Sequence, residues 1–184
     1  MTAPKANWLP TPIEGVLTRA VAFNSDGRGA FGELWRESWT AGLGLHFTQA
    51  NLSLSDAGVL RGLHFHERQT DLWVVLEGRA LVALVDLRPM LSGGDLVQPP
   101  SQTIELTSGD TVVIPTGVAH GFLALEPVRL LYLVTNEYDG TDEHGFAWSD
   151  PLAALGWPTD EPTLSERDAA APSLTEALRS MRER

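Results

Sequence analysis

The sequence predicts a mainly β protein, a sandwich or small barrel of short strands followed by one short helix. From about residue 30 to residue 135, short runs suited to strands alternate with turn signals such as LEGR, LTSGD and IPTG. Near the end, Ser173 is followed three residues later by Glu176, a capping box that opens a helix. The 184 residues suffice for one domain with its own core, so we expect a single domain over residues 1–184.

The elements are expected in the following order. Residues 1–14 are polar and rich in proline, and are predicted to form an extended arm. Strand-like runs follow at residues 30–39, 46–55, 71–78, 79–88, 102–115, 120–125 and 128–135. Residues 89–100 form a longer loop, and residues 139–184 are expected to pack on the barrel as a C-terminal segment that ends in the short helix.

Composition excludes several classes of function. A net charge of −11 argues against general affinity for nucleic acid or anionic membranes, and no apolar run is long enough to cross a membrane. The absence of cysteine excludes disulfides and thiolate chemistry and fits a cytoplasmic protein. Lys5 is the only lysine, so positive charge inside a pocket must come from arginine, histidine or a metal.

Two histidines stand out in the stretch GVLRGLHFHERQTDLWVVLEG. His64 and His66 are two residues apart, so in a strand they point to the same face, and Asp71 follows them. With the later Gly109-x5-Pro115-x-Gly117-x2-His120, this spacing resembles the two motifs of the cupin superfamily, with Asp71 where Glu is usual. The resemblance implies a jelly-roll barrel with polar side chains aimed inside. The alternative is that these histidines only satisfy structural hydrogen bonds.

A narrower resemblance covers roughly residues 12–178. The blocks that carry it are SDGRGAFGE (25–33), TQANLSLS (48–55), GVLRGLHF (58–65), VALVDLR (82–88), IPTGVAHGFLAL (114–125), LLYLVTNEYD (130–139) and LSERDAAAP (164–172). They resemble, in order, the dTDP-4-dehydrorhamnose 3,5-epimerase (RmlC) family. That resemblance implies an RmlC-like jelly roll, a homodimer without a cofactor, and inversion at C3 and/or C5 of a 4-keto-6-deoxyhexose on a nucleoside diphosphate.

The implied reaction needs three groups. Removing a hydrogen beside the ketone gives an enolate, so a base, an acid on the opposite face and stabilisation of the enolate oxygen are required. By the resemblance, His64 is the base, Asp168 orients it and Tyr132 is the acid. The pairing of residues 64 and 168 is carried over from the family.

The resemblance also implies a set of substrate-binding residues. Arg28 and Arg61 would hold the diphosphate and sugar, since a guanidinium donates in a fork to oxygen-rich anions. Tyr138 would pack on the thymine base, and Phe31 could join it. Further ligands of the nucleotide sugar would be Glu33, Gln49, Asn51 and the second active-site histidine, His120.

Two positions depart from the family pattern. The family usually has Gln at the position of His66 and Lys at or near position 71, where an ionised Asp71 has the wrong charge for an enolate. Three hypotheses follow. The first is a metal-free epimerase in which His66 or Arg68 replaces the lysine. The second is a metal-binding cupin, an isomerase or oxygenase, with a divalent transition metal on His64, His66, Asp71 and His120. The third is a catalytically silent binder of sugar nucleotides. The first two exclude each other at His64, because a base bound to a metal cannot take a proton.

Overall fold

The computed structural model describes residues 7–183. Its strands are β1 (Leu9–Pro10), β2 (Leu17–Ala20), β3 (Phe23–Asp26), β4 (Gly29–Gly32), β5 (Gln49–Ser55), β6 (Leu60–Phe65), β7 (Asp71–Glu77), β8 (Arg79–Asp86), β9 (Ser101–Thr107), β10 (Asp110–Ile114), β11 (Val118–Ala124), β12 (Val128–Val134) and β13 (His144–Gly145). Its helices are α1 (Glu37–Thr40), a 3-10 turn at Ala41–Leu43, α2 (Arg88–Leu91), α3 (Glu166–Ala169) and α4 (Leu174–Arg182). The fold is mainly β, as the sequence predicts.

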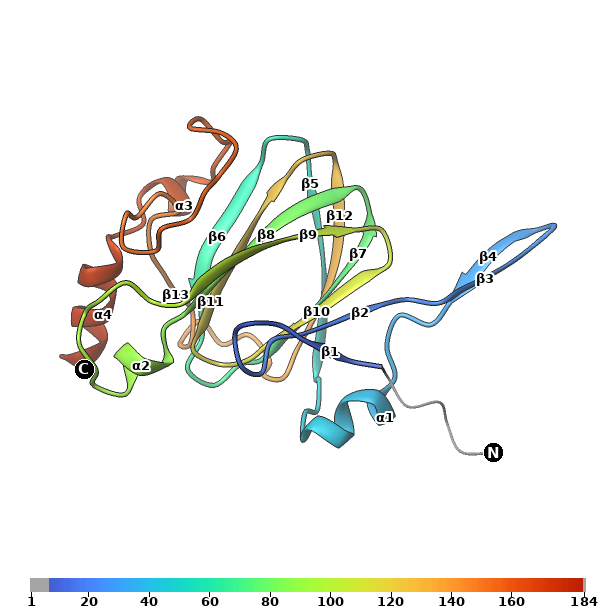
Figure 1. The fold of residues 1–184 in the computed structure, drawn as a ribbon, viewed down its shortest axis with the longest axis horizontal. Coiled ribbons are helices and arrows are strands. Elements are labelled where there is room, and N and C mark those ends of the chain that lie inside the picture. The colour runs from blue at the N-terminus through green and yellow to red at the C-terminus, as the bar shows by residue number, and fades with distance from the viewer. Residues whose placement is uncertain (1–6, 184) are drawn as a thin grey trace.

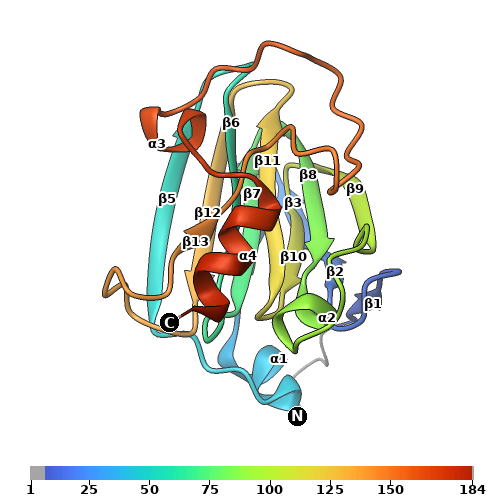
Figure 2. The same ribbon diagram turned by 90° about the vertical axis from the view of Figure 1, so that its left-hand side faces the viewer.

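The strands form a jelly-roll-like sandwich of two sheets rather than a single closed barrel. A six-stranded sheet has the order β1-β2-β10-β7-β12-β5, and a five-stranded sheet has the order β13-β6-β11-β8-β9. The two sheets face each other (Figures 1 and 2), and side chains from both form an apolar core. The strands β3 and β4 form a separate hairpin that projects away from the sandwich (Figure 1).

Residues 80–85 of β8, the run ALVALV, are all apolar because both faces of this strand are covered. Val82 and Leu84 point into the core between the sheets. Ala83 and Val85 point outward, where Leu178 of α4 and neighbouring side chains of the C-terminal segment cover them (Figure 2). The alternation of strand side chains therefore places two apolar layers on one strand.

Two segments differ from the sequence expectation. The strand predicted over residues 30–39 ends at Gly32, and Glu37–Thr40 is helical instead. Trp39 of this helix is buried, and its ring packs against the guanidinium of Arg19 at 3.9 Å. In the predicted arm, residues 9–10 pair with β2 and Ile13 is only 3% exposed in the main core, while residues 1–6 lie outside the described part.

The predicted capping box is present at the start of α4. Ser173 Oγ accepts a hydrogen bond from the Glu176 amide, and the Glu176 carboxylate accepts one from the Ser173 amide. None of the helices within residues 7–183 is long and apolar enough to cross a membrane.

Candidate active site

A pocket of about 590 Å³ is lined by inner-face side chains of both sheets. The five-stranded sheet contributes His64 and His120, and the six-stranded sheet contributes Asn51, Asp71 and Tyr132. The volume lies within the usual range for sites that hold small organic ligands.

Strands β6 and β11 set His64 and His120 side by side. The two residues are register partners of antiparallel strands, so their side chains share one face of the sheet. A bulge follows, between His120 and Phe122. There the backbones approach so closely that a Cβ at Gly62 would lie 2.7 Å from the His120 carbonyl oxygen. Glycine at this position is therefore part of what positions both histidines.

Asp168 reaches His64 from the far end of the chain. Thr163 exchanges backbone hydrogen bonds with Gly58 and Leu60, which brings the C-terminal segment beside the start of β6. The short helix α3 then follows, and its N-cap residue is Ser165, whose hydroxyl accepts a hydrogen bond from the Asp168 backbone amide at 3.1 Å. This places the carboxylate Oδ1 of Asp168 at 2.9 Å from Nε2 of His64.

The environment keeps Asp168 ionised and defines the free nitrogen of His64. Burial alone would raise the pKa of Asp168, but the hydrogen bond and charge of His64, with further hydrogen bonds from Ser165 and the Gly62 backbone, hold it below its usual value. A carboxylate only accepts hydrogen bonds, so His64 donates from Nε2. Nδ1 is then the nitrogen that can accept a proton.

Tyr132 belongs to the facing sheet. It lies on β12, paired with Asn51 of β5, and its side chain is half-buried in the pocket. Burial, together with the negative charges of Asp71 and Glu143, raises the pKa of the Tyr132 hydroxyl despite an opposing effect of Arg61. At neutral pH this hydroxyl therefore carries its proton.

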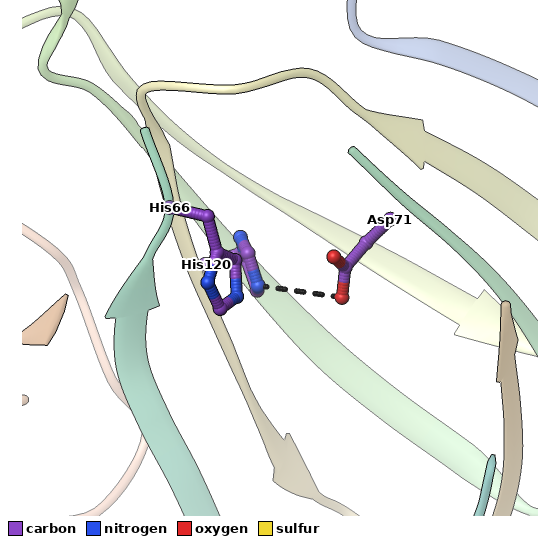
Figure 3. A group of neighbouring side chains, drawn as sticks. All are labelled: His66, Asp71 and His120. Atoms are coloured by element: carbon purple, nitrogen blue, oxygen red, sulfur yellow. Dashed lines mark ion pairs between the residues drawn. The ribbon is translucent and has the colours of Figure 1, made fainter. Parts of the chain in front are cut away.

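Asp71 lies at the start of β7 in a buried polar group with His66 and His120 (Figure 3). Its two carboxylate oxygens accept hydrogen bonds from Gln69 Nε2 at 2.8 Å and from Trp73 Nε1 at 3.1 Å. Nε2 of His120 lies 3.7 Å from Asp71 Oδ2. Burial lowers the pKa of His120 to about 4, more than the nearby charge of Asp71 raises it, so this imidazole is neutral at pH 7.

The four residues predicted as a metal set do not form one group. One nitrogen or oxygen atom from each of His66, Asp71 and His120 lies within 4.8 Å of the others, but His64 is not a member of this group. Its Nε2 is hydrogen-bonded to Asp168 instead. The residue predicted as the base thus lies outside the group that could hold a metal, and the two hypotheses no longer exclude each other at His64.

The predicted substrate-binding residues fall into two sets. Gln49, Asn51, Arg61, His120 and Tyr138 line the pocket, and the Gln49 side-chain oxygen accepts a hydrogen bond from the Tyr138 amide at 2.9 Å. Arg28, Phe31 and Glu33 do not line it.

Those three residues belong to the projecting β3–β4 hairpin and the residue after it. The Arg28 side chain is 91% exposed and pairs with Asp26, whereas Phe31 is 69% exposed. Glu33 pairs with Arg36. These three residues therefore lie outside the pocket of their own chain, and their role in binding substrate stays a prediction.

Several pocket residues were not predicted from the sequence. They are Ser53, Gln69, Trp73, Leu130, Asn136, Glu143 and Arg167. Ser53 and Trp73 could have been found, because each lies two residues beyond a predicted site residue on the same strand and so shares its face. Glu143 and Arg167 pair at 3.0 Å, and they come from the loop before β13 and from the four-residue helix α3, neither of which carries such a periodicity.

Comparison with known proteins agrees with this geometry. The family model for dTDP-4-dehydrorhamnose 3,5-epimerase matches residues 10–176. The chain belongs to this family. It is 35% identical over 189 aligned positions to the dTDP-4-dehydrorhamnose 3,5-epimerase of Mycobacterium tuberculosis, an alignment that covers 96% of this chain and 90% of the relative.

Solved structures of this epimerase family have the same fold. The RmlC epimerase of Mycobacterium tuberculosis superimposes with a TM-score of 0.84 at 32% identity, covering 95% of this chain and 92% of the other. ChmJ, a 3'-monoepimerase from Streptomyces bikiniensis in complex with dTDP-quinovose, superimposes with a TM-score of 0.82 at 31% identity, covering 94% and 90%. The RmlC-like fold predicted from the motifs is confirmed.

Proposed function

We propose that this protein is an isomerase, an epimerase that inverts C3, C5 or both in a dTDP-linked 4-keto-6-deoxyhexose. One observation carries the proposal. A hydrogen-bonded His64–Asp168 pair lies on one wall of the pocket, and the protonated hydroxyl of Tyr132 lies on the facing sheet. Inversion through an enolate requires removal of a proton from one face and its return on the other, which this arrangement supplies.

His64 would act as the base. With Nε2–H donated to Asp168, the lone pair of Nδ1 takes the hydrogen beside the ketone, and the buried carboxylate stabilises the imidazolium that forms. Tyr132 would then donate its proton to the opposite face of the enolate. Its raised pKa suits this role, because the hydroxyl is protonated before the step begins.

The nucleotide sugar would lie along the inner face of β5 and the loop that follows β12. Gln49 and Asn51 are hydrogen-bonded to each other at 2.9 Å, which orients their amides in the pocket. Arg61 is anchored by the Ser55 hydroxyl at 2.9 Å and would meet sugar or diphosphate oxygens. The exposed ring of Tyr138 would stack on the base.

The protein is proposed to act as a homodimer in which the β3–β4 hairpin reaches the partner's pocket. Arg28 and Phe31 are exposed on that hairpin, outside the pocket of their own chain. Leu52 and Leu54 are 57% and 61% exposed on the edge strand β5, an apolar surface that a second copy would cover. Location in the cytoplasm also stays a prediction, based on the cysteine-free composition.

The test is proton exchange in heavy water. With dTDP-4-keto-6-deoxyglucose as substrate, proton NMR should show loss of the C3 signal, the C5 signal or both, and the pattern tells a 3-epimerase from a 3,5-epimerase. The His64→Asn variant should abolish exchange, whereas His46→Asn, a change at an exposed histidine paired with Glu37, should not. Tight binding of dTDP by the parent without any exchange would instead indicate a silent sugar-nucleotide binder.

A further inference from the structure

The group formed by His66, Asp71 and His120 is built from three separate elements and shielded from solvent. His66 follows β6, Asp71 begins β7 and His120 lies on β11, so both sheets contribute. The three residues are 8%, 3% and 5% exposed, and one donor atom from each lies within 4.8 Å of the others (Figure 3). Burial of a carboxylate next to two imidazoles is costly unless a positive charge accompanies it.

Backbone carbonyls define which nitrogen of each imidazole is free. Nδ1 of His120 lies 3.0 Å from the Val118 carbonyl oxygen, and Nδ1 of His66 is hydrogen-bonded to the Asp142 carbonyl oxygen. A carbonyl oxygen can only accept, so Nδ1 donates in both rings, and Nε2 is the nitrogen left to bind a metal. This is the usual arrangement around a histidine that binds a metal, whose other nitrogen donates to a carbonyl or carboxylate.

The carboxylate of Asp71 is held just as firmly. Gln69 and Trp73 each donate to one of its oxygens, which orients it toward His120. Nε2 of His120 and Oδ2 of Asp71 then face each other at 3.7 Å, which is too long for a hydrogen bond between them. A cation between these two buried atoms would be bound by both.

We propose that His66, Asp71 and His120 bind one divalent first-row transition-metal cation. Two neutral imidazoles and a carboxylate are ligands preferred by Zn²⁺, Fe²⁺, Co²⁺ and Ni²⁺, and three protein ligands leave coordination positions open to the pocket. A bound cation would supply positive charge to a pocket in which Asp71 occupies the position of the family's expected lysine. The proposal goes beyond the epimerase function and does not depend on it, because His64 stays paired with Asp168.

A second group, formed by Glu67, Asp142 and His144, is the weaker metal candidate. The Glu67 side chain is 58% exposed. The Asp142 carboxylate already accepts hydrogen bonds from the backbone amides of Glu67, Arg68 and Gln69 at 2.7 to 3.1 Å. The position of Asp142 is thus explained by these hydrogen bonds, which anchor the loop at residues 67–69. The second group serves as a control for the metal-binding experiment.

The experiment measures metal bound by untagged protein purified without metal-affinity chromatography and stripped with EDTA. After incubation with Zn²⁺ or Co²⁺ and desalting, elemental analysis should find one equivalent per chain, and the Co²⁺ form should show visible d–d absorption. Asp71→Asn and His120→Gln should each weaken Zn²⁺ binding at least about 100-fold, since loss of even an outer-shell partner costs 10- to 100-fold. Thermal unfolding of the metal-free variants checks that each still folds.

Matched variants distinguish this site from its alternatives. Asp56→Asn and His46→Gln, both at exposed positions, and Glu67→Gln of the second group should each keep the full equivalent of metal. His64→Gln should keep the metal while losing substrate exchange, which separates the metal site from the proposed base. The proposal is overturned by a parent that binds less than a stoichiometric amount at micromolar Zn²⁺, or by folded Asp71→Asn and His120→Gln variants that bind as the parent does.

Discussion

The hydrogen bond between His64 and Asp168 offers the most direct test of the proposed chemistry, through the isosteric change Asp168→Asn. The change removes a negative charge 2.9 Å from the imidazole while keeping the size of the side chain. It also keeps the backbone amide of residue 168, which donates to the Ser165 hydroxyl that caps α3. The variant should therefore still fold at neutral pH, although with lower stability, so that its effect on proton transfer can be measured.

The magnitude follows from the geometry. Unit charges 2.9 Å apart interact by about 6 kcal/mol at an effective dielectric constant of about 20. The His64 side chain is 26% exposed, so solvent screens part of this, and the measured range for hydrogen bonds to charged groups, about 1.5–3 kcal/mol, is the better guide. At about 1.4 kcal/mol for each factor of ten, about 3 kcal/mol corresponds to a rate loss on the order of 100-fold.

A second effect adds to the loss of charge. The amide NH₂ of the introduced asparagine can donate to Nε2 of His64, which moves the imidazole proton to Nδ1 and removes the lone pair that takes the substrate proton. Such a change of tautomer raises the expected loss toward about 10⁴-fold, the scale seen when the carboxylate of a His–Asp pair is made an amide. We therefore expect proton exchange to slow by about 10²- to 10⁴-fold.

The assay is deuterium incorporation at saturating dTDP-4-keto-6-deoxyglucose, with dTDP affinity measured by calorimetry. Affinity should stay near that of the parent, because Asp168 acts on the base and not on the nucleotide. Asp160→Asn, at an exposed position in the same C-terminal segment, is the matched control. An exchange rate for Asp168→Asn within about threefold of the parent would refute the assignment of His64 and Asp168 as the working pair.

Three further predictions test the role of Tyr132 on the facing sheet, the role of the β3–β4 hairpin in a dimer, and the pH dependence of stability that Asp168 causes. Tyr132→Phe should keep deuterium exchange, because His64 still removes the proton, but should lose inversion, which NMR of the product sugar reports; inversion at the parental rate would exclude Tyr132 as the acid. If the hairpin completes the partner's pocket, mixing equal amounts of Arg28→Ala and His64→Asn chains should restore activity in about a quarter of the sites. Half of the dimers are then mixed, and each mixed dimer holds one intact site. A monomer by light scattering, or no recovery of activity on mixing, would contradict this. The lowered pKa of Asp168 means that its folded state binds fewer protons than its unfolded state, so its stabilisation is present above about pH 4 and is lost as pH falls through the folded pKa. Urea unfolding should thus show that Asp168→Asn is less stable than the parent at pH 7. The difference should shrink as the pH falls below about 4, and a difference that does not change with pH would contradict the linkage.

The sequence by itself determined the features that depend on neighbouring residues. The apolar run LLYLV predicted a strand that carries Tyr132, and the spacing of His64 and His66 placed both on one side of another strand. The capping box at Ser173 also follows from local hydrogen bonding, and it formed as expected. These features need only the periodicity of a strand or the first turn of a helix, which is why the family motifs in them could be recognised.

Only the tertiary structure decided which distant residues meet. Asp168 reaches His64 because the segment at Thr163 is hydrogen-bonded beside β6. The two residues are 104 positions apart in the sequence, so no local pattern encodes their contact. The same pairing removes His64 from the predicted metal set and leaves a compact group of His66, Asp71 and His120. Arg28 lies on a hairpin that leaves the sandwich, so a residue type suited to a diphosphate is not in its own chain's pocket. In each case the outcome depends on how the loops close and how the two sheets pack, and both depend on contacts between residues far apart in the chain.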